Sequence, residues 1–118
     1  MDMTVLIVDD HPSFRASART LLEAEGFEVV GEAENGESAI QAARDLDPDL
    51  VLLDVQLPDL DGFEVAEQLR KFEDPPAVIL TSSRDGADYG HCIARCGARG
   101  FVPKADLSGA AIAALFPA

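Results

Sequence analysis

Leu50-Val-Leu-Leu-Asp-Val-Gln-Leu-Pro-Asp-Leu-Asp-Gly62 is the stretch of sequence from which the fold is predicted. Its first part is an apolar run that ends in an acid, Asp54, and its second part is an acidic loop that contains a proline. A short, continuous apolar run between turn signals is typical of a strand that is buried on both faces. Such strands occur in parallel sheets covered by helices, so we expect an α/β fold.

Outward from this stretch, apolar runs alternate with helical patterns over the whole chain. We predict strands at residues 4–8, 27–31, 50–54, 77–81 and 100–103. Helices are predicted to begin near residues 12, 37, 63, 85 and 107, with Gly26 and Gly97 ending two of them and Asp106 or Ser108 capping the last. Pro103 cannot donate to a central ladder, so the fifth strand is expected at an edge of the sheet.

These elements predict one domain over residues 1–118, a five-stranded parallel sheet flanked by five helices. Right-handed crossovers leave few topologies, and the common doubly wound, flavodoxin-like solution has the strand order 2-1-3-4-5. Its switch point lies between the first and third strands, which end at Asp9-Asp10 and Asp54.

The charge of the chain excludes one class of function. With 22 acidic and 9 basic residues the net charge is −13, and no basic stripe is present, so direct binding of nucleic acid is not expected. No apolar run approaches the ~20 residues that span a bilayer, and the N-terminus lacks the features of a signal peptide. We expect a cytoplasmic protein without membrane contact.

The two cysteines, Cys92 and Cys96, are four residues apart on a predicted helix. Their spacing is that of two small apolar residues on a buried helix face. A redox pair, or a metal site with His91, is the alternative for this position.

Polar side chains follow several of the predicted strands. Asp9 and Asp10 follow the first strand, Asp54 ends the third, and Ser82 and Lys104 follow the fourth and fifth. Because the carboxyl ends of parallel strands meet at one edge, these side chains are expected to converge there. Carboxylates with an ammonium and a hydroxyl suggest a divalent cation and phosphoryl chemistry. Taken singly, the acid pair also suits a helix cap, and Asp54 also suits a turn.

The segment Asp54–Gly62 resembles the phosphoacceptor segment of bacterial response-regulator receiver domains, and 7–15 (IVDDHPSFR) resembles the opening of that family. Residues 80–83 (LTSS) and 97–104 (GARGFVPK) resemble its later motifs. The resemblance covers essentially the whole chain, in order and at matching spacing. The opening also resembles receivers that precede helix-turn-helix output domains.

The resemblance implies a metal site and a site of modification. Asp54 would be phosphorylated. Asp10 and Asp54 would bind Mg²⁺ (or Mn²⁺) directly, Asp9 would act partly through water, and the backbone carbonyl of Gln56 would add a ligand.

The resemblance also implies residues that respond to the phosphoryl group. Ser82 would donate a hydrogen bond to it, with Thr81 as the alternative, and Lys104 would pair with its oxygens. Phe101 occupies the position of the aromatic switch residue of the family.

The function implied is a phosphorylation-controlled signalling switch that promotes only its own aspartyl phosphorylation and dephosphorylation, not an enzyme acting on other substrates. Its phosphodonor would be a sensor histidine kinase or a histidine phosphotransfer protein. Phosphorylation would alter the surface formed by the fourth helix, fifth strand and fifth helix, through which a homodimer is also possible.

The chain departs from the family pattern in one place at the edge of the site, and three further residues lie beside it. Many receivers follow the lysine with proline, whereas here Pro103 precedes Lys104 and Ala105 follows it. Arg84 and Gln56 flank the expected phosphoryl position and are expected to influence the access of water. His11 follows the acid pair and is expected to be a partly exposed residue at the start of a helix.

Other functions are possible on such a fold. A Mg²⁺-dependent phosphohydrolase with an aspartyl-phosphate intermediate would need a second acid two residues after the nucleophile, where this chain has Gln56. A flavodoxin-like cofactor binder would need a phosphate-binding loop in place of Asp9-Asp10. A receiver-like scaffold that is never phosphorylated is the third alternative.

Overall fold

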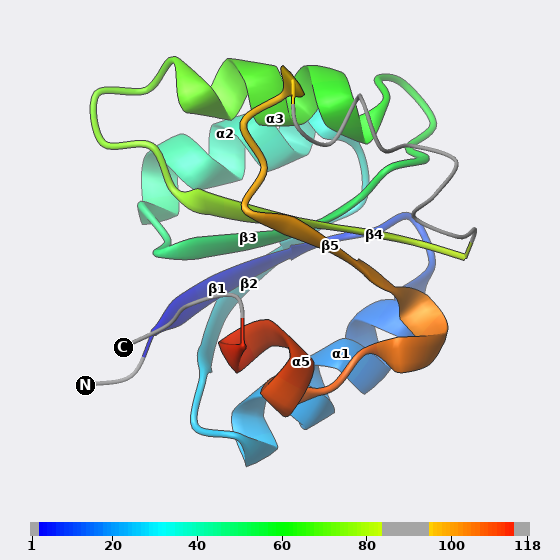
Figure 1. The fold of residues 1–118 in the computed structure, drawn as a ribbon. Helices are drawn as coiled ribbons and strands as arrows, with labels where there is room; N and C mark the ends of the chain where they lie inside the picture. Colours follow the sequence, from blue (N-terminus) through cyan, green and yellow to red (C-terminus); the bar gives the residue numbers. More distant parts are fainter. Residues whose placement is uncertain (1–2, 84–94, 115–118) are drawn as a thin grey trace.

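The chain forms a five-stranded parallel sheet, seen from the side in Figure 1, in a computed structural model that describes residues 3–83 and 95–114. The strand order is β2-β1-β3-β4-β5, with every pairing parallel, which confirms the predicted topology. The strands are β1 (Thr4–Val8), β2 (Glu28–Ala33), β3 (Leu50–Asp54), β4 (Ala77–Ser82) and β5 (Gly100–Pro103). As predicted from Pro103, β5 lies at an edge.

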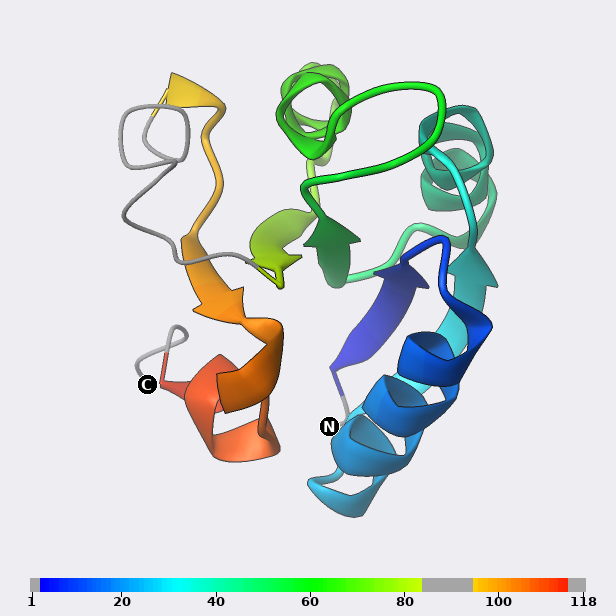
Figure 2. The same ribbon diagram turned by 90° about the vertical axis from the view of Figure 1, so that its right-hand side faces the viewer.

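Helices cover both faces of the sheet. The described helices are α1 (Pro12–Ala24), α2 (Gly36–Leu46), α3 (Gly62–Arg70), α5 (Gly109–Ala113) and a short 3-10 helix (Lys104–Asp106). In Figure 2, α1 and α5 lie on one face of the sheet and α2 and α3 lie on the other. The helix predicted from residue 85 to residue 96 falls mainly on residues 84–94, which lie outside the described part. Along residues 3–83 and 95–114, no helix is long and apolar enough to cross a membrane.

Strand ends differ from prediction by one or two residues. β2 continues to Ala33 because Ala33 pairs with Val8, so the edge strand extends as far as the central strand beside it. β4 continues to Ser82, which pairs with Pro103. The last helix begins at Gly109, two residues later than predicted, and is preceded by the 3-10 helix at Lys104–Asp106, which the sequence pattern did not reveal.

Local hydrogen bonds fix where the helices begin. The side chains of Asn35, Asp61 and Ser108 accept hydrogen bonds from backbone N–H groups in the first turns of α2, α3 and α5. Of the two caps proposed for the last helix, Ser108 is therefore the correct one. Gly26, with φ +95°, and Gly97, with φ +80°, occupy the left-handed region predicted for residues that end helices.

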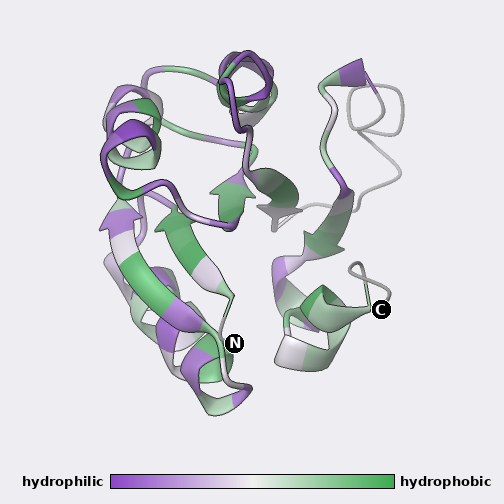
Figure 3. Cartoon of the chain, turned by 90° about the vertical axis from the view of Figure 1, so that its left-hand side faces the viewer, coloured by the Kyte–Doolittle hydropathy of each residue, from purple (hydrophilic) through white to green (hydrophobic). Residues whose placement is uncertain are grey.

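Two apolar cores lie on either side of the sheet, and Figure 3 shows the hydrophobic colour concentrated in the strands between them. The α2–α3 cluster contains Leu6, Val8, Ala33, Ala39, Ala43, Val51, Leu53, Val55, Val65, Ala66, Leu69, Val78, Leu80 and Cys96. The α1–α5 cluster contains Val5, Ile7, Ala18, Leu22, Val29, Leu50, Leu52, Ile79, Val102 and Ile112. Alternate residues of each central strand therefore enter opposite cores.

Cys96 is a small apolar core residue, as predicted, because it is 2% exposed within the α2–α3 cluster. Burial raises the pKa of its thiol, which keeps the side chain neutral. Cys92 and His91, the other members of the alternative redox or metal site, lie outside the described residues.

Candidate functional site

The register of the sheet places the candidate residues at one edge. Val8 pairs with Leu53, so Asp9 and Asp54 follow side by side on adjacent strands. Asp54 in turn pairs with Thr81 on β4. Figure 2 views the sheet onto these strand ends, with the loops after β1, β3 and β5 around them.

Asp9 is buried at the end of β1 and its two carboxylate oxygens differ. Oδ1 accepts hydrogen bonds from the backbone N–H of His11 (2.8 Å) and shares one with the imidazole Nδ1 of His11 (3.0 Å). Oδ2 lies 2.6 Å from Nζ of Lys104, a short ion pair. A buried carboxylate is costly unless a cation pairs with it, and the Lys104 ammonium is the partner of this oxygen.

Asp54 is buried beside Asp9 and is 3% exposed. Its Oδ1 accepts the backbone N–H of Gln56 (3.1 Å), and its Oδ2 accepts a hydrogen bond from Lys104 Nζ (3.3 Å). Burial raises the pKa of Asp54, and the neighbouring Asp9 charge raises it further, against the opposing effects of Gln56 N–H and Lys104. Ionisation of Asp54 beside the charged Asp9 is therefore unfavourable, and a bound cation would reduce the repulsion between the two carboxylates.

Lys104 brings its ammonium group between the two acids from the 3-10 helix after β5. Burial by itself would lower the pKa of Lys104, but the Asp9 and Asp54 carboxylates outweigh it and raise the pKa, so the side chain is an ammonium. Nζ also lies 4.5 Å from the centre of the Phe14 ring. All peptide bonds in the described residues are trans, and Ala105 continues the 3-10 helix where many receivers have proline.

The residues at this edge fit a divalent cation. Ligand atoms of Asp9, Asp10, His11 and Asp54 all lie within 4.8 Å of one another. Three clustered carboxylates near a single ammonium leave an excess of negative charge, which suits a hard cation such as Mg²⁺. The donor set therefore fits the metal that the sequence predicts.

His11 was predicted to be a partly exposed residue at the start of a helix, and the structure also places it in contact with the acid pair. It is the N-cap of α1 and its side chain is 64% exposed, which agrees with that prediction. Its Nδ1, however, also lies 3.1 Å from Asp10 Oδ1, so the imidazole contacts both members of the acid pair.

The two candidate hydroxyl residues lie on opposite faces of β4. Thr81 and Ser82 are each 1% exposed. Leu80 belongs to the α2–α3 cluster and Ile79 to the α1–α5 cluster, so alternation places Thr81 on the same face as Asp54 and Ser82 on the other. Thr81 Oγ1 has no hydrogen-bond partner in the described structure.

Phe101 is half-buried in β5 and packs against the α2–α3 cluster. It pairs with Leu80, one strand away from Leu53. The predicted switch residue therefore lies on the face of the sheet that α3 covers, away from the ammonium group of Lys104. Arg84 lies outside the described residues.

Arg15 is a residue of the site that had no assigned role from the sequence. Its Nη1 donates a hydrogen bond of 2.6 Å to the backbone carbonyl of Asp9, and its Nε donates to Glu32 on β2 at 3.0 Å. Glu32 also accepts from Arg19 at 2.9 Å. Partial burial would raise the pKa of Glu32, but Arg19 and Arg15 together lower it, so the carboxylate holds both arginines. This network ties the loop after β1 to α1 and β2.

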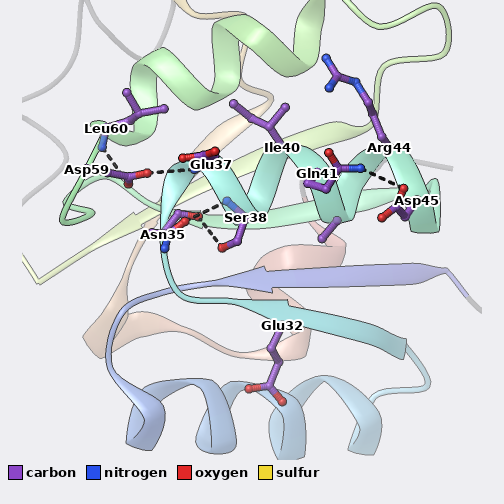
Figure 4. Close-up of a pocket in the computed structure, with 11 residues that line it drawn as sticks. Glu32, Asn35, Glu37, Ser38, Ile40, Gln41, Arg44, Asp45, Asp59 and Leu60 are labelled. Carbon is purple, nitrogen blue, oxygen red and sulfur yellow. Dashed lines mark hydrogen bonds between the residues drawn. The ribbon is translucent and has the colours of Figure 1, made fainter.

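Asp59 is a second residue that sequence reasoning missed. Its carboxylate accepts hydrogen bonds from the backbone N–H groups of Gly36 (2.7 Å), Glu37 (3.0 Å) and Leu60 (2.8 Å). Figure 4 shows Asp59 beside the first turn of α2, at one end of an open hollow of about 1020 Å³. Asp59 thereby joins the loop after Asp54 to α2.

Gly62 brings the same loop back against the strand. Its N–H donates to the carbonyl of Val55 at 2.7 Å, and a Cβ at this position would lie 2.5 Å from the carbonyl oxygen of Asp54. Only glycine allows that approach without a shift of the backbone.

Comparison with known proteins identifies similar sequences. Residues 5–113 match the family model described as the response regulator receiver domain. The chain is 42% identical over 100 residues to BvgA of Bordetella pertussis, covering 85% of this chain and 48% of that protein. It is 38% identical over 113 residues to the DNA-binding transcriptional activator EvgA of Escherichia coli K12, covering 96% of this chain and 55% of EvgA. The chain thus spans about half the length of these relatives.

Solved structures of response regulators have the same fold as this chain. The signal receiver domain of NarL from Mycobacterium tuberculosis superposes with a TM-score of 0.87 at 31% identity, covering 99% of this chain and 98% of that one. A LuxR-family two-component response regulator from Aurantimonas sp. SI85-9A1 gives a TM-score of 0.87 at 29% identity, covering 98% and 86% of the two chains.

Proposed function

The chain belongs to the response regulator receiver domain family, the signalling modules of two-component systems, and we propose that Asp54 is its phosphoacceptor. The observation that supports this most is the placement of Asp54. It is a buried carboxylate at a strand end, hydrogen-bonded to Lys104 and beside Asp9. No other pair of described carboxylates shares a lysine in this way.

We propose Mg²⁺, or Mn²⁺, as the cofactor, held by Asp9, Asp10, Asp54 and the backbone carbonyl of Gln56. The clustering of the three acids around a single ammonium supports this set. The bound cation would supply positive charge that offsets the repulsion between the acids and an anionic phosphoryl group.

During transfer, one carboxylate oxygen of Asp54 attacks the phosphorus of the donor. The new O–P bond forms as the bond from phosphorus to the donor nitrogen breaks, and the electron pair leaves with that nitrogen. Lys104 exchanges its ion pair with Asp9 for the phosphoryl oxygens, and Ser82, or Thr81 in its place, donates a hydrogen bond to them.

The switch follows from these new contacts. Drawing Lys104 and the β4 hydroxyl toward the phosphoryl group displaces the loops after β4 and β5, and Phe101 packs further inward. The surface of the fourth helix, β5 and α5 is then altered for a partner or for homodimer formation. The chain catalyses only its own phosphorylation and dephosphorylation.

Membership of the family supports a proposal for the partners. We propose a sensor histidine kinase or a histidine phosphotransfer protein as the donor, and we expect the domain to act in the cytoplasm. Residues 1–118 form one receiver domain, and by similarity to EvgA its output is the control of a DNA-binding regulator of transcription.

The proposal is tested by incubating the protein with Mg²⁺ and acetyl phosphate and measuring its intact mass. Wild type is expected to gain one phosphoryl group, and Asp54→Asn is expected to gain none. Asp74→Asn, an exposed acid before β4, serves as the matched control and should be phosphorylated normally. An adduct that persists in Asp54→Asn would refute the assignment, and multiple turnover of a phosphate ester would favour a phosphohydrolase.

A further inference from the structure

Phe14 makes a contact with the site that its position in an apolar core does not require. It lies in the first turn of α1, is half-buried, and packs against the α1–α5 cluster. Its ring centre is also 4.5 Å from Nζ of Lys104. An ammonium at this distance from an aromatic face is attracted by the ring quadrupole.

The ammonium of Lys104 has three partners from three different elements. Asp9 at the end of β1 lies 2.6 Å from it, Asp54 at the end of β3 lies 3.3 Å from it, and Phe14 on α1 supplies the ring. The lysine side chain is only 17% exposed, so solvent weakens these attractions less than it would at the surface.

We propose that Phe14 is a positioning residue for Lys104, which holds the ammonium beside Asp54 through a cation–π contact. The proposal rests on the proposed function of Asp54 as phosphoacceptor. An aliphatic residue of similar size at position 14 would fill the core but would not attract the charge.

The contact has a specific use during phosphorylation. Lysine has a long, flexible stem and pays rotamer entropy whenever its charge is held in one place. Both carboxylate partners of Lys104 change when Asp54 is modified, because one becomes the acyl phosphate and the other loses the ammonium. In the unmodified protein two carboxylates hold the ammonium together with the ring, whereas in the modified protein the ring is the one original partner that remains. Weakening the ring should therefore cost more in the modified protein than in the unmodified one, which would raise the dissociation constant of a phosphoryl mimic.

The competing interpretation is that Phe14 only packs the core. Phe27 provides the matched comparison, because it is also half-buried and packs against the same cluster. Within residues 3–83 and 95–114, no cation lies over the Phe27 ring. A contribution from packing should be the same at both positions, whereas an electrostatic contribution should be confined to Phe14.

The test replaces Phe14 by 4-fluoro-, 3,5-difluoro- and 3,4,5-trifluorophenylalanine in the full chain, using a suppressor tRNA. Fluorine withdraws charge from the ring face and hardly changes its size. The probe is beryllofluoride with Mg²⁺, which mimics a phosphoryl group on a carboxylate. The dissociation constant is expected to rise stepwise, reaching about threefold to tenfold for the trifluoro ring, in line with the strength of partly buried cation–π contacts.

A second readout does not depend on phosphoryl chemistry. The ε-methylene resonances of Lys104 in the metal-free protein should be shifted by the ring current of Phe14, and the shift should shrink across the fluorine series. The same series at Phe27 should change neither quantity.

A dissociation constant and a Lys104 shift that stay constant across the Phe14 series, or that change equally in the Phe27 series, overturn the positioning role. If wild type binds no beryllofluoride and forms no phosphoryl adduct, the proposed function itself fails and the positioning role fails with it. The Lys104 resonances then show whether the contact is structural. The two failures are therefore distinguishable.

Discussion

At the scale of single residues, the site is short of positive charge. Two buried carboxylates, Asp9 and Asp54, share one ammonium, and the exposed Asp10 adds a third negative charge nearby. Removing charges from water is costly unless opposite charges compensate them. The excess of carboxylates at this site therefore favours the binding of a cation. Phosphorylation of Asp54, which adds more negative charge, is therefore proposed to need a bound Mg²⁺.

The choice between Ser82 and Thr81 is also decided at this scale. Thr81→Val replaces a buried hydroxyl that has no partner by a methyl group, so the free energy of unfolding should rise by about 1 kcal/mol, measured by urea denaturation. Phosphorylation of Asp54 should continue in this variant.

Ser82→Ala is the paired experiment. We expect it to lower the affinity for beryllofluoride by about tenfold, the value of one hydrogen bond to a charged group. The opposite pattern, in which Thr81→Val weakens binding and Ser82→Ala does not, would transfer the role to Thr81, whose register beside Asp54 would then explain it.

At the scale of elements, the loop between β3 and α3 is held at both ends. Asp59 ties it to the first turn of α2, and Gly62 lies against the backbone of Asp54. The loop that carries the neighbours of the phosphoacceptor therefore has little freedom, which keeps Gln56 N–H on the Asp54 carboxylate.

Asp59→Ala tests the hydrogen bonds that join the loop to α2, because their contribution to stability should depend on pH. The backbone N–H groups of Gly36, Glu37 and Leu60 lower the pKa of Asp59 below its usual value of 3.8. A lowered pKa means that the carboxylate stabilises the fold above pH 3.8 and that this stability is lost as the pH falls through the lowered pKa. The melting temperature of the variant should be lower than that of wild type at neutral pH, and the difference should shrink in acid. A difference that grows in acid would show that Asp59 is not held by these donors.

Gly62→Ala tests the close contact between Gly62 and the backbone at the end of β3. Its Cβ would lie 2.7 Å from the Cα of Val55, which forces the loop to move. We expect a loss of about 1–3 kcal/mol in the free energy of unfolding, as for other overpacked sites. Gln68→Ala, an exposed change on the same helix, should stay within about 0.5 kcal/mol of wild type. Equal stability of the two variants would mean that the close approach is easily relieved.

At the scale of the whole molecule, the net charge of −13 works against the folded state. Raising NaCl from about 0.01 to about 0.1 M shortens the Debye length from about 30 to about 10 Å, which weakens this self-repulsion. The melting temperature should therefore rise with salt. Mg²⁺ at matched ionic strength should raise it further, and Asp10→Asn should lose that increment while Asp74→Asn keeps it. Equal effects of Mg²⁺ on both variants would place the cation elsewhere.

The fold could be predicted because its signals are local. The apolar runs of β1, β3 and β5 give their bounds without error, and the parallel order follows from the alternation of strands and helices. The ends of β2 and β4 were misplaced because a strand continues as long as its neighbour offers partners. The 3-10 helix at Lys104–Asp106 was missed because no periodicity marks three residues.

The sequence by itself determined the family, the sheet and the residues that end its strands, because strand-end acids and loop motifs are contiguous in the chain. Tertiary structure alone decided which atoms meet. Lys104 is 50 residues from Asp54 in the chain, yet its ammonium lies 3.3 Å from the carboxylate, and it rests over Phe14 from a third element. The strand-end positions predicted that Lys104 and Asp54 converge, because parallel strands end at one edge of the sheet. The contact with Phe14 depends instead on how α1 and the segment after β5 pack on one face of the sheet, and no pattern in either segment marks that packing.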